Sequence, residues 1–155
     1  MNYPQAYHIT WGTYGTRLPG SAKPHVTLDR NVYQTALPTA DPKREQSARD
    51  KMRQPPVYLS RGHRVCVDRA IIDLATRYDW TLHALAPQSD HVHVVITAPR
   101  VGQDLRDALK AITSRWLNQQ FAHQKWWAEH GSCKYLYEDS YFNNATQYVR
   151  RQREI

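Results

Sequence analysis

A run of β-branched residues with two histidines at its head constrains the fold of this chain most strongly. The run reads DHVHVVITAP over residues 90–99. β-Branched side chains favour an extended backbone, so the run predicts a strand. Because successive side chains of a strand point to opposite faces, His91 and His93 are predicted to project side by side from one face of a sheet. Such a pair could bind a metal, carry a proton or have no chemical function.

Three further segments are predicted to join this strand in an antiparallel sheet. They are rich in β-forming residues and are bounded by turn residues, and they cover residues 6–11, 80–86 and 133–137. The turn at residues 87–90 connects the second segment directly to the histidine strand. These two strands should therefore form a hairpin.

Apolar residues at helical spacing predict the helices. The segments are 68–78, which Asp68 opens, 101–125, and 139–153, which Asp139 or Ser140 caps. A solvated helix is also expected over residues 41–54, with Asp41 as its cap and an end at Pro55. The main elements follow in the order β, α, β, β, α, β, α. This order predicts an α+β fold: a ferredoxin-like antiparallel sheet with helices on one face, plus a C-terminal helix.

The length of 155 residues fits a single domain over residues 1–155. Residues 21–38 show no clean helical or strand periodicity, so an insertion or irregular segment is expected at about 21–56.

No stretch approaches the roughly 18 apolar residues that a membrane span needs, and residues 1–11 lack the features of a signal peptide. Two cysteines without close spacing fit a reducing compartment. We therefore expect a cytoplasmic protein with no membrane partner.

The charge balance favours a polyanionic partner. The chain has 21 Lys and Arg against 14 Asp and Glu, for a formal net charge of +7. It also has ten Tyr and five Trp, which beside a basic surface could stack on unpaired bases.

The last predicted helix adds the second half of a candidate site. Tyr148 and Gln152 lie four residues apart and share one helix face, which Asn144 continues toward the N-terminus. Two imidazoles and one amide oxygen would make a three-ligand metal site with open positions, and the tyrosine one turn away is a potential nucleophile. A metal with vacant positions can act as a Lewis acid on a phosphate. Each half is uninformative alone, but together they indicate phosphoryl-transfer chemistry.

These residues resemble the HUH single-tyrosine transposases of small bacterial insertion sequences (insertion sequence 200/605 type) and their REP-associated relatives. The resemblance rests on the His-hydrophobe-His motif at 91–93, followed by Tyr148 with Gln152 four residues on in a C-terminal helix. The opening YHITWGTYGTRLPG at 7–20 and the region 126–148 are also similar to that family. The resemblance thus covers most of the chain, while residues 21–56 are less recognisable.

The resemblance implies a transposase that cleaves and rejoins single-stranded or hairpin DNA. Tyr148 would attack the scissile phosphate and leave a 5′-phosphotyrosine and a free 3′-hydroxyl, so that a second 3′-hydroxyl could reverse the reaction without ATP. By resemblance, His91, His93 and Gln152 would bind Mg²⁺ or Mn²⁺. Imidazole by itself favours zinc, iron, copper or nickel, so ligand chemistry and family expectation differ on the metal.

Further residues have expected supporting functions. His8 in the first strand and Asn144 are candidates to orient the metal ligands, although a buried structural histidine is an equal alternative for His8. Relatives include monomers and dimers with exchanged helices, so a homodimer is one expected state. Six basic residues are candidates for contacts with the DNA backbone: Arg17, Lys110, Arg115, Arg150, Arg151 and Arg153.

Two alternatives remain open at this stage. The stretch HVHVVITA also resembles the histidine-triad nucleotide hydrolases, but Val95 stands where their motif needs a third histidine. The chain could instead be a non-cleaving domain, derived from a transposase, that binds structured DNA or RNA. Trapping of DNA on Tyr148 would separate this second alternative from the enzyme.

Overall fold

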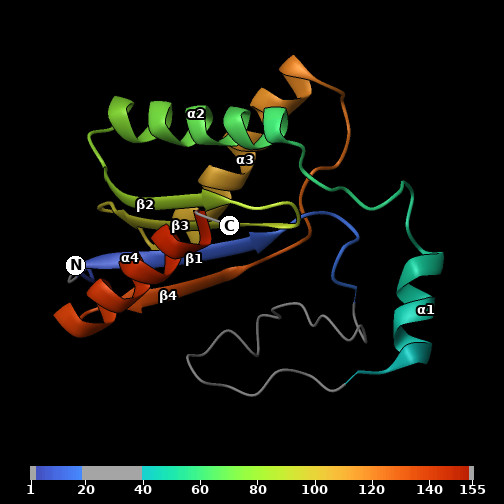
Figure 1. The fold of residues 1–155 in the computed structure, drawn as a ribbon, viewed down its shortest axis with the longest axis horizontal. Coiled ribbons are helices and arrows are strands. Elements are labelled where there is room, and N and C mark those ends of the chain that lie inside the picture. The colour runs from blue at the N-terminus through green and yellow to red at the C-terminus, as the bar shows by residue number, and fades with distance from the viewer. Residues whose placement is uncertain (1–2, 19–39, 154–155) are drawn as a thin grey trace.

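Four strands form one antiparallel sheet in the order β2-β3-β1-β4 (Figure 1). The computed structural model describes residues 3–18 and 40–153. The strands are β1 (Ala6–Gly12), β2 (Thr81–Pro87), β3 (His91–Thr97) and β4 (Ser132–Leu136). All four predicted strands are present, and β2 and β3 form the expected hairpin. The histidine strand β3 lies in the middle of the sheet beside β1.

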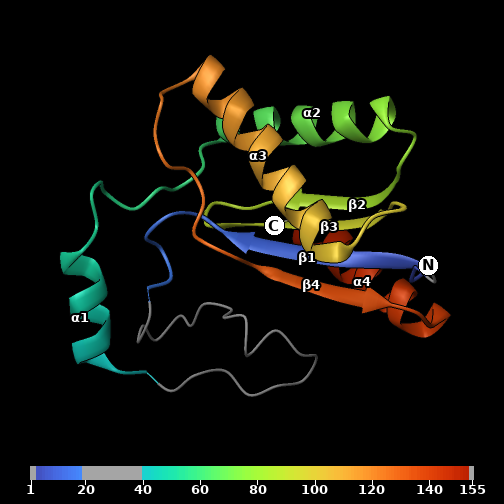
Figure 2. The ribbon, with the colours of Figure 1, turned by 180° about the vertical axis from the view of Figure 1, so that it is seen from behind.

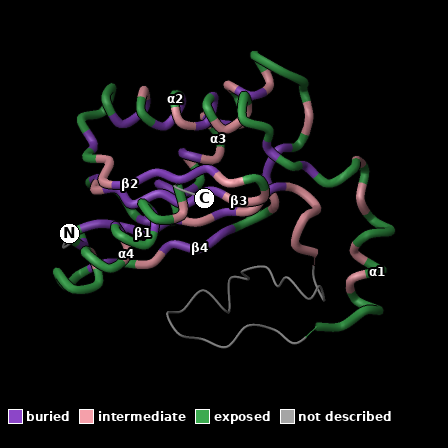
Figure 3. Tube along the Cα trace, in the orientation of Figure 1, coloured by how far each residue is buried: buried purple, intermediate pink, exposed green. Residues whose placement is uncertain are grey.

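Helices cover both faces of this sheet. They are α1 (Pro42–Asp50), α2 (Arg61–Arg77), α3 (Gly102–Gln120) and α4 (Asp139–Arg153). α2 and α3 pack on one face and α4 crosses the other (Figures 1 and 2). α1 stands apart from the sheet, and none of its residues is buried (Figure 3). The predicted α+β fold, with its additional C-terminal helix, is confirmed.

The two faces of the sheet are packed differently. Large residues of β1 and β3, such as Tyr7, Ile9 and Val94, point toward α2 and α3 and form the main core. The opposite face carries a smaller apolar cluster beneath α4, composed of Ala6, Ala84, Ala86, Val95, Leu136 and Val149. His8, Thr10, His91 and His93 occupy the same alternate positions as this cluster. The polar residues of the sheet therefore share the face that α4 covers.

Two predicted helix boundaries are wrong. α2 begins at Arg61 rather than Asp68, because Ser60 caps it: the Ser60 side chain accepts from the His63 backbone, and the His63 ring accepts from the Ser60 backbone. α3 ends at Gln120 rather than residue 125. Phe121 leaves the helical conformation, and its ring packs edge-on against His63 at 4.5 Å between centroids.

The predictions for the segment before α2 are confirmed in part. Asp41 caps α1 as predicted, accepting hydrogen bonds from two backbone N–H groups, but a third predicted boundary is also wrong, because α1 ends at Asp50 rather than residue 54. An insertion was expected at about 21–56. Residues 21–39 of it lie outside the described residues, and residues 40–56 form α1 and an irregular connection. Among the described helices, none has the length and apolar character that crossing a bilayer requires.

Candidate active site

Three rings from β3 and α4 converge on the face of the sheet beneath α4. His91 and His93 point the same way from β3, with 4.7 Å between their ring centroids. Tyr148 comes from α4, and its ring centroid lies 5.4 Å from that of His93. β1 adds His8, 6.2 Å from the Tyr148 ring. The structure thus brings together residues that are more than 50 positions apart in the chain.

His93 is held by two side chains of β1. Its Nδ1 lies 3.0 Å from Thr10 Oγ1 and 3.1 Å from His8 Nε2. Burial, with smaller contributions from the His91 and His8 charges, lowers the pKa of His93 to about 3. Burial and Lys134 lower the pKa of His8 to about 4. Both rings are therefore neutral near pH 7, which is the state in which imidazole can ligate a metal.

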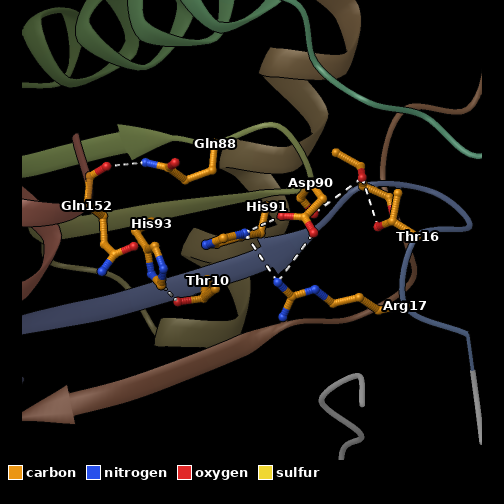
Figure 4. A network of polar contacts seen from close by, with 9 residues as sticks. Thr10, Thr16, Arg17, Gln88, Asp90, His91, His93 and Gln152 are labelled. Atoms are coloured by element: carbon orange, nitrogen blue, oxygen red, sulfur yellow. Dashed lines mark hydrogen bonds and ion pairs between the residues drawn. The ribbon is translucent and has the colours of Figure 1, made fainter. Parts of the chain in front are cut away.

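Asp90 and Arg17 hold the other histidine (Figure 4). The His91 Nδ1 lies 2.7 Å from Asp90 Oδ1, and Arg17 Nη2 lies 3.5 Å from Asp90 Oδ2. Burial alone would raise the pKa of Asp90, but the hydrogen bond to His91 and the Arg17 charge outweigh it and keep this pKa below its ordinary value. Asp90 is therefore a carboxylate that accepts the proton of His91 Nδ1.

The donor atoms that remain fit a divalent cation. Both histidines use Nδ1 for contacts within the protein, and neither Nε2 has a hydrogen-bond partner among the described residues. Metal-binding histidines commonly donate their second ring N–H to a carboxylate, as His91 does to Asp90. The described residues contain no group of three or more His, Cys, Asp or Glu suited to a metal. Among the described residues, a third protein ligand would therefore be of another type.

Gln152 comes from α4 and has an amide oxygen to offer. Figure 4 shows its side chain reaching from the helix toward the side of the sheet that carries His93. Its backbone carbonyl accepts a hydrogen bond from Gln88 Nε2 at 2.5 Å. Gln88 belongs to the β2–β3 turn, two residues before Asp90. This contact ties the end of α4 to the turn that begins the histidine strand.

Tyr148 is the accessible member of the site. Its relative exposure is 41%, against 6% for His93, so part of this side chain is open to solvent. Asn144 is exposed one turn earlier on α4, and its side chain makes no hydrogen bond with the described residues. Its predicted function in orienting the ligands therefore remains a prediction, whereas His8 makes the contact expected of such a residue.

The six basic candidates fall into two groups. Arg17 lies beside His91, and Arg150, Arg151 and Arg153 belong to α4. Lys110 and Arg115 belong to α3, on the opposite side of the sheet from Tyr148. Lys110 donates to the carbonyls of Ala128 and His130, and burial lowers its pKa to about 8. The structure thus places Arg17 and the α4 arginines on the face of the candidate site, and Lys110 and Arg115 away from it.

Sequence reasoning missed three residues of the site: Thr10, Gln88 and Asp90. Asp90 had a readable signal, since an acidic residue directly precedes the first histidine of the motif. Thr10 could be placed only through the pairing of β1 with β3, which brings it opposite His93. Gln88 had no signal, because its contact depends on where α4 ends.

The neutral histidine pair predicts a protein that loses stability in mild acid. The folded pKa values of His8 and His93, about 4 and about 3, lie below the ordinary value of 6.5. As pH falls below 6.5, the unfolded chain binds more protons than the folded chain, so the free energy of unfolding falls. Urea unfolding in EDTA at several pH values from 7.5 to 5 measures this loss.

Two variants control that measurement. His8→Asn should flatten the dependence on pH, whereas replacement of the exposed His123 by Asn should leave it unchanged. A wild-type free energy of unfolding that stays constant from pH 6.5 to 5 contradicts the assignment.

The chain was compared with protein families, curated proteins and solved structures. Solved structures include a similar fold, the crystal structure of a candidate transposase from Deinococcus radiodurans R1, with a TM-score of 0.49 and 19% identity over 98% of this chain and 93% of that chain. No curated protein matched the chain. A family model described as "Transposase IS200 like" matches residues 50–153, a range that contains β3, α4 and every residue of the His-hydrophobe-His and tyrosine motifs. The chain therefore belongs to the family of IS200-like transposases.

Proposed function

We propose that this chain cleaves and rejoins single-stranded DNA through Tyr148, as the transposase of a small insertion sequence or REP-type element. The observation that carries the proposal is the convergence of His91, His93 and Tyr148, with ring centroids 4.7 and 5.4 Å apart, on one accessible face. Phosphoryl transfer needs a nucleophile beside groups that stabilise charge on the phosphate, and this face offers both.

The proposed step is a transesterification. The Tyr148 oxygen attacks the scissile phosphorus and loses its proton, the bond from phosphorus to the 3′-oxygen breaks, and the leaving oxygen takes up a proton. The products are a 5′-phosphotyrosine and a free 3′-hydroxyl. The number of phosphodiester bonds is unchanged, so attack by a second 3′-hydroxyl on the phosphotyrosine releases Tyr148 and joins the strands without another energy source.

The chain's own residues would hold a divalent metal, Mg²⁺ or Mn²⁺. The Nε2 atoms of His91 and His93 and the amide oxygen of Gln152 are the proposed ligands. When bound, such an ion polarises a phosphate oxygen and stabilises the charge that develops there. Asp90 and His8 fix the ring orientations from behind, and Arg17 offers a positive charge at the rim of the site.

Single-stranded or hairpin DNA suits this site. Tyr148 stands out on a helix that crosses the sheet rather than at the bottom of a pocket, and the net charge of +7 favours a polyanion. A strand can therefore lie along α4 with its phosphates exposed to the nucleophile.

The test is trapping of the covalent intermediate. Wild-type protein is incubated with a 5′- or 3′-end-labelled hairpin with single-stranded flanks and Mn²⁺, and the products are separated on a denaturing gel. We expect a labelled protein band that carries only the DNA 3′ of the break, and a shortened 5′ fragment with a free 3′-hydroxyl. DNA binding without any adduct, across substrates and metals, would favour the non-cleaving domain instead.

Binding of the single strand should weaken steeply as salt rises. Each phosphate that a cation neutralises releases counterions, which contributes a slope of about −0.7 to log K against log salt for single strands. Arg17→Ala should reduce the slope by roughly that amount, whereas Arg115→Ala, on the opposite face, should leave it unchanged. Fluorescence anisotropy over a salt series measures both. Equal effects of the two variants contradict the proposed DNA path.

A further inference from the structure

We infer that Arg153 and Asp68 form a positioning pair that holds α4, and with it Tyr148, over the histidines of the same chain. This inference rests on the proposed function, because its importance lies in the distance from the nucleophile to the proposed metal ligands. It gives Arg153 a different task from the DNA contact that sequence alone suggests.

The pair has the geometry of a specific clamp. Arg153 Nη2 lies 2.7 Å from Asp68 Oδ2 and Arg153 Nη1 lies 3.0 Å from Asp68 Oδ1, so the guanidinium meets the carboxylate in a two-point contact. Nη1 also donates to the carbonyl of Leu85 in β2 at 2.8 Å. One side chain thus links the last turn of α4 to both α2 and the edge strand. Two-point contacts fix orientation as well as distance.

Packing alone holds α4 weakly. Of its residues, Thr146 and Val149 are buried, and the surface beneath them consists largely of alanines. An open surface pocket of about 450 Å³ adjoins the last turns of α4, α2 and β2, with Ile72, Leu82 and Arg150 in its lining beside Asp68 and Arg153. Because few apolar contacts anchor this end of the helix, its polar contacts contribute to its position beside the packing of Val149.

Three tethers act on the C-terminal half of α4. Besides Arg153, Arg150 donates to the carbonyl of His83 at 3.3 Å and the Gln152 carbonyl accepts from Gln88. Arg153 is the only one of the three whose partner is a charged side chain. The Asp68 side chain is 16% exposed and the Arg153 side chain 54%, so the carboxylate end of the pair is shielded from solvent while the guanidinium end stays open to it.

The consequence for chemistry follows from helix geometry. Tyr148 lies five residues before Arg153, about 7.5 Å along a rigid helix at 1.5 Å per residue. A shift or rotation at Arg153 is therefore transmitted to the Tyr148 ring. Misplacement of a reacting group by about 1 Å can cost up to 100-fold in rate. The pair also keeps the whole candidate site within one chain.

The test compares Arg153→Ala, Asp68→Asn and the double variant. We expect each single change to slow adduct formation, measured in a single turnover at saturating DNA, by roughly 10- to 100-fold. The double variant should be no slower than the slower single variant, because both changes remove the same contact. Asp73→Asn is the matched control: Asp73 pairs with Arg77 on the surface of α2, one turn beyond Asp68 and away from α4, and its loss should leave the rate unchanged.

DNA affinity distinguishes this inference from a DNA contact by Arg153. A positioning pair predicts that both single variants are slow while their affinity for the strand stays within about twofold of wild type. If Arg153 contacts phosphate instead, Arg153→Ala weakens binding and Asp68→Asn, which frees the arginine, binds at least as tightly and reacts normally. Rates within twofold of wild type in both single variants, or effects that multiply in the double variant, also overturn the inference.

Hydrogen exchange tests the pair without relying on activity. Amides of residues 146–152 should exchange faster in both single variants than in wild type or Asp73→Asn, while those of α3 stay protected. Unchanged exchange in α4 overturns the positioning pair whether or not the wild type forms an adduct. Absence of an adduct in the wild type, together with faster exchange in both variants, overturns the proposed function and leaves the tether standing.

Discussion

Tyr148→Phe is expected to abolish the covalent protein–DNA adduct and to leave DNA and metal binding close to wild type. The change removes one oxygen and keeps the ring, which packs near His93 and His8 at 5.4 and 6.2 Å. No hydrogen bond of the Tyr148 hydroxyl to another described residue is lost, so the fold should not be affected. The measurement is the denaturing gel with end-labelled hairpin DNA, run beside anisotropy binding of the same DNA.

Tyr137→Phe is the matched control, because Tyr137 is exposed just after β4 and lies outside the converging rings. It should form the adduct at the wild-type rate. An adduct that persists in Tyr148→Phe means that another residue is the nucleophile, and that the site on α4 has been misassigned.

The second large effect is expected from the histidines. His91→Ala and His93→Ala each remove a proposed ligand, so cleavage should disappear together with Mn²⁺ affinity. Gln152→Ala should be milder, since water can replace one neutral oxygen ligand, and excess Mn²⁺ should partly restore its rate. Asp90→Asn should keep the ligands but lose the carboxylate that orients His91, which costs roughly 10- to 100-fold in metal affinity.

Isothermal titration with Mn²⁺ and the rate of adduct formation against Mn²⁺ concentration measure this series. His123 is exposed and lies beyond the end of α3, so His123→Ala controls for nonspecific binding of the metal to histidine. Unaltered Mn²⁺ affinity in both His91→Ala and His93→Ala would show that the metal, if one binds, is held elsewhere.

The central part of the site could be predicted because its signals are local. Alternation along β3 determines that His91 and His93 share a face, and helical spacing determines that Tyr148 and Gln152 do. A ferredoxin-like sheet favours a central first strand; in the structure β1 pairs with β3, and this pairing places His8 next to His93. These rules act over a few residues, or follow from topology, so one sequence is sufficient to apply them.

Helix boundaries were less accessible because one depends on an unusual local cap and another on a tertiary contact. The start of α2 depends on a reciprocal cap in which His63 stands where glutamate or glutamine is usual. The end of α3 depends on Phe121, whose ring contacts that same His63. A helical pattern continues past residue 120 in the sequence, and a tertiary contact overrides it.

The function of a given basic residue was the hardest property to infer. From the sequence, Arg153 and Lys110 are equivalent: each is a basic residue and a candidate for contact with DNA. Arg153 meets a carboxylate 85 positions away, and Lys110 donates to two carbonyls of the segment between α3 and β4. The sequence gives the number of basic residues, but contacts with residues distant in the chain determine which of them are available to bind DNA.

The small side chains of the alanine-rich cluster beneath α4 determine how closely the helix packs on the sheet. Ala6, Ala84 and Ala86 allow the helix backbone to approach the sheet closely, and Val95 and Leu136 complete the layer. A valine or leucine in place of one of these alanines would raise the helix, because close-packed layers accommodate added volume by moving apart. The distance from Tyr148 to the histidines of the sheet thus depends on the volume of the side chains beneath α4. Relatives with bulkier residues at these positions would need a longer reach from the helix, or a differently tilted one, to bring the same atoms together.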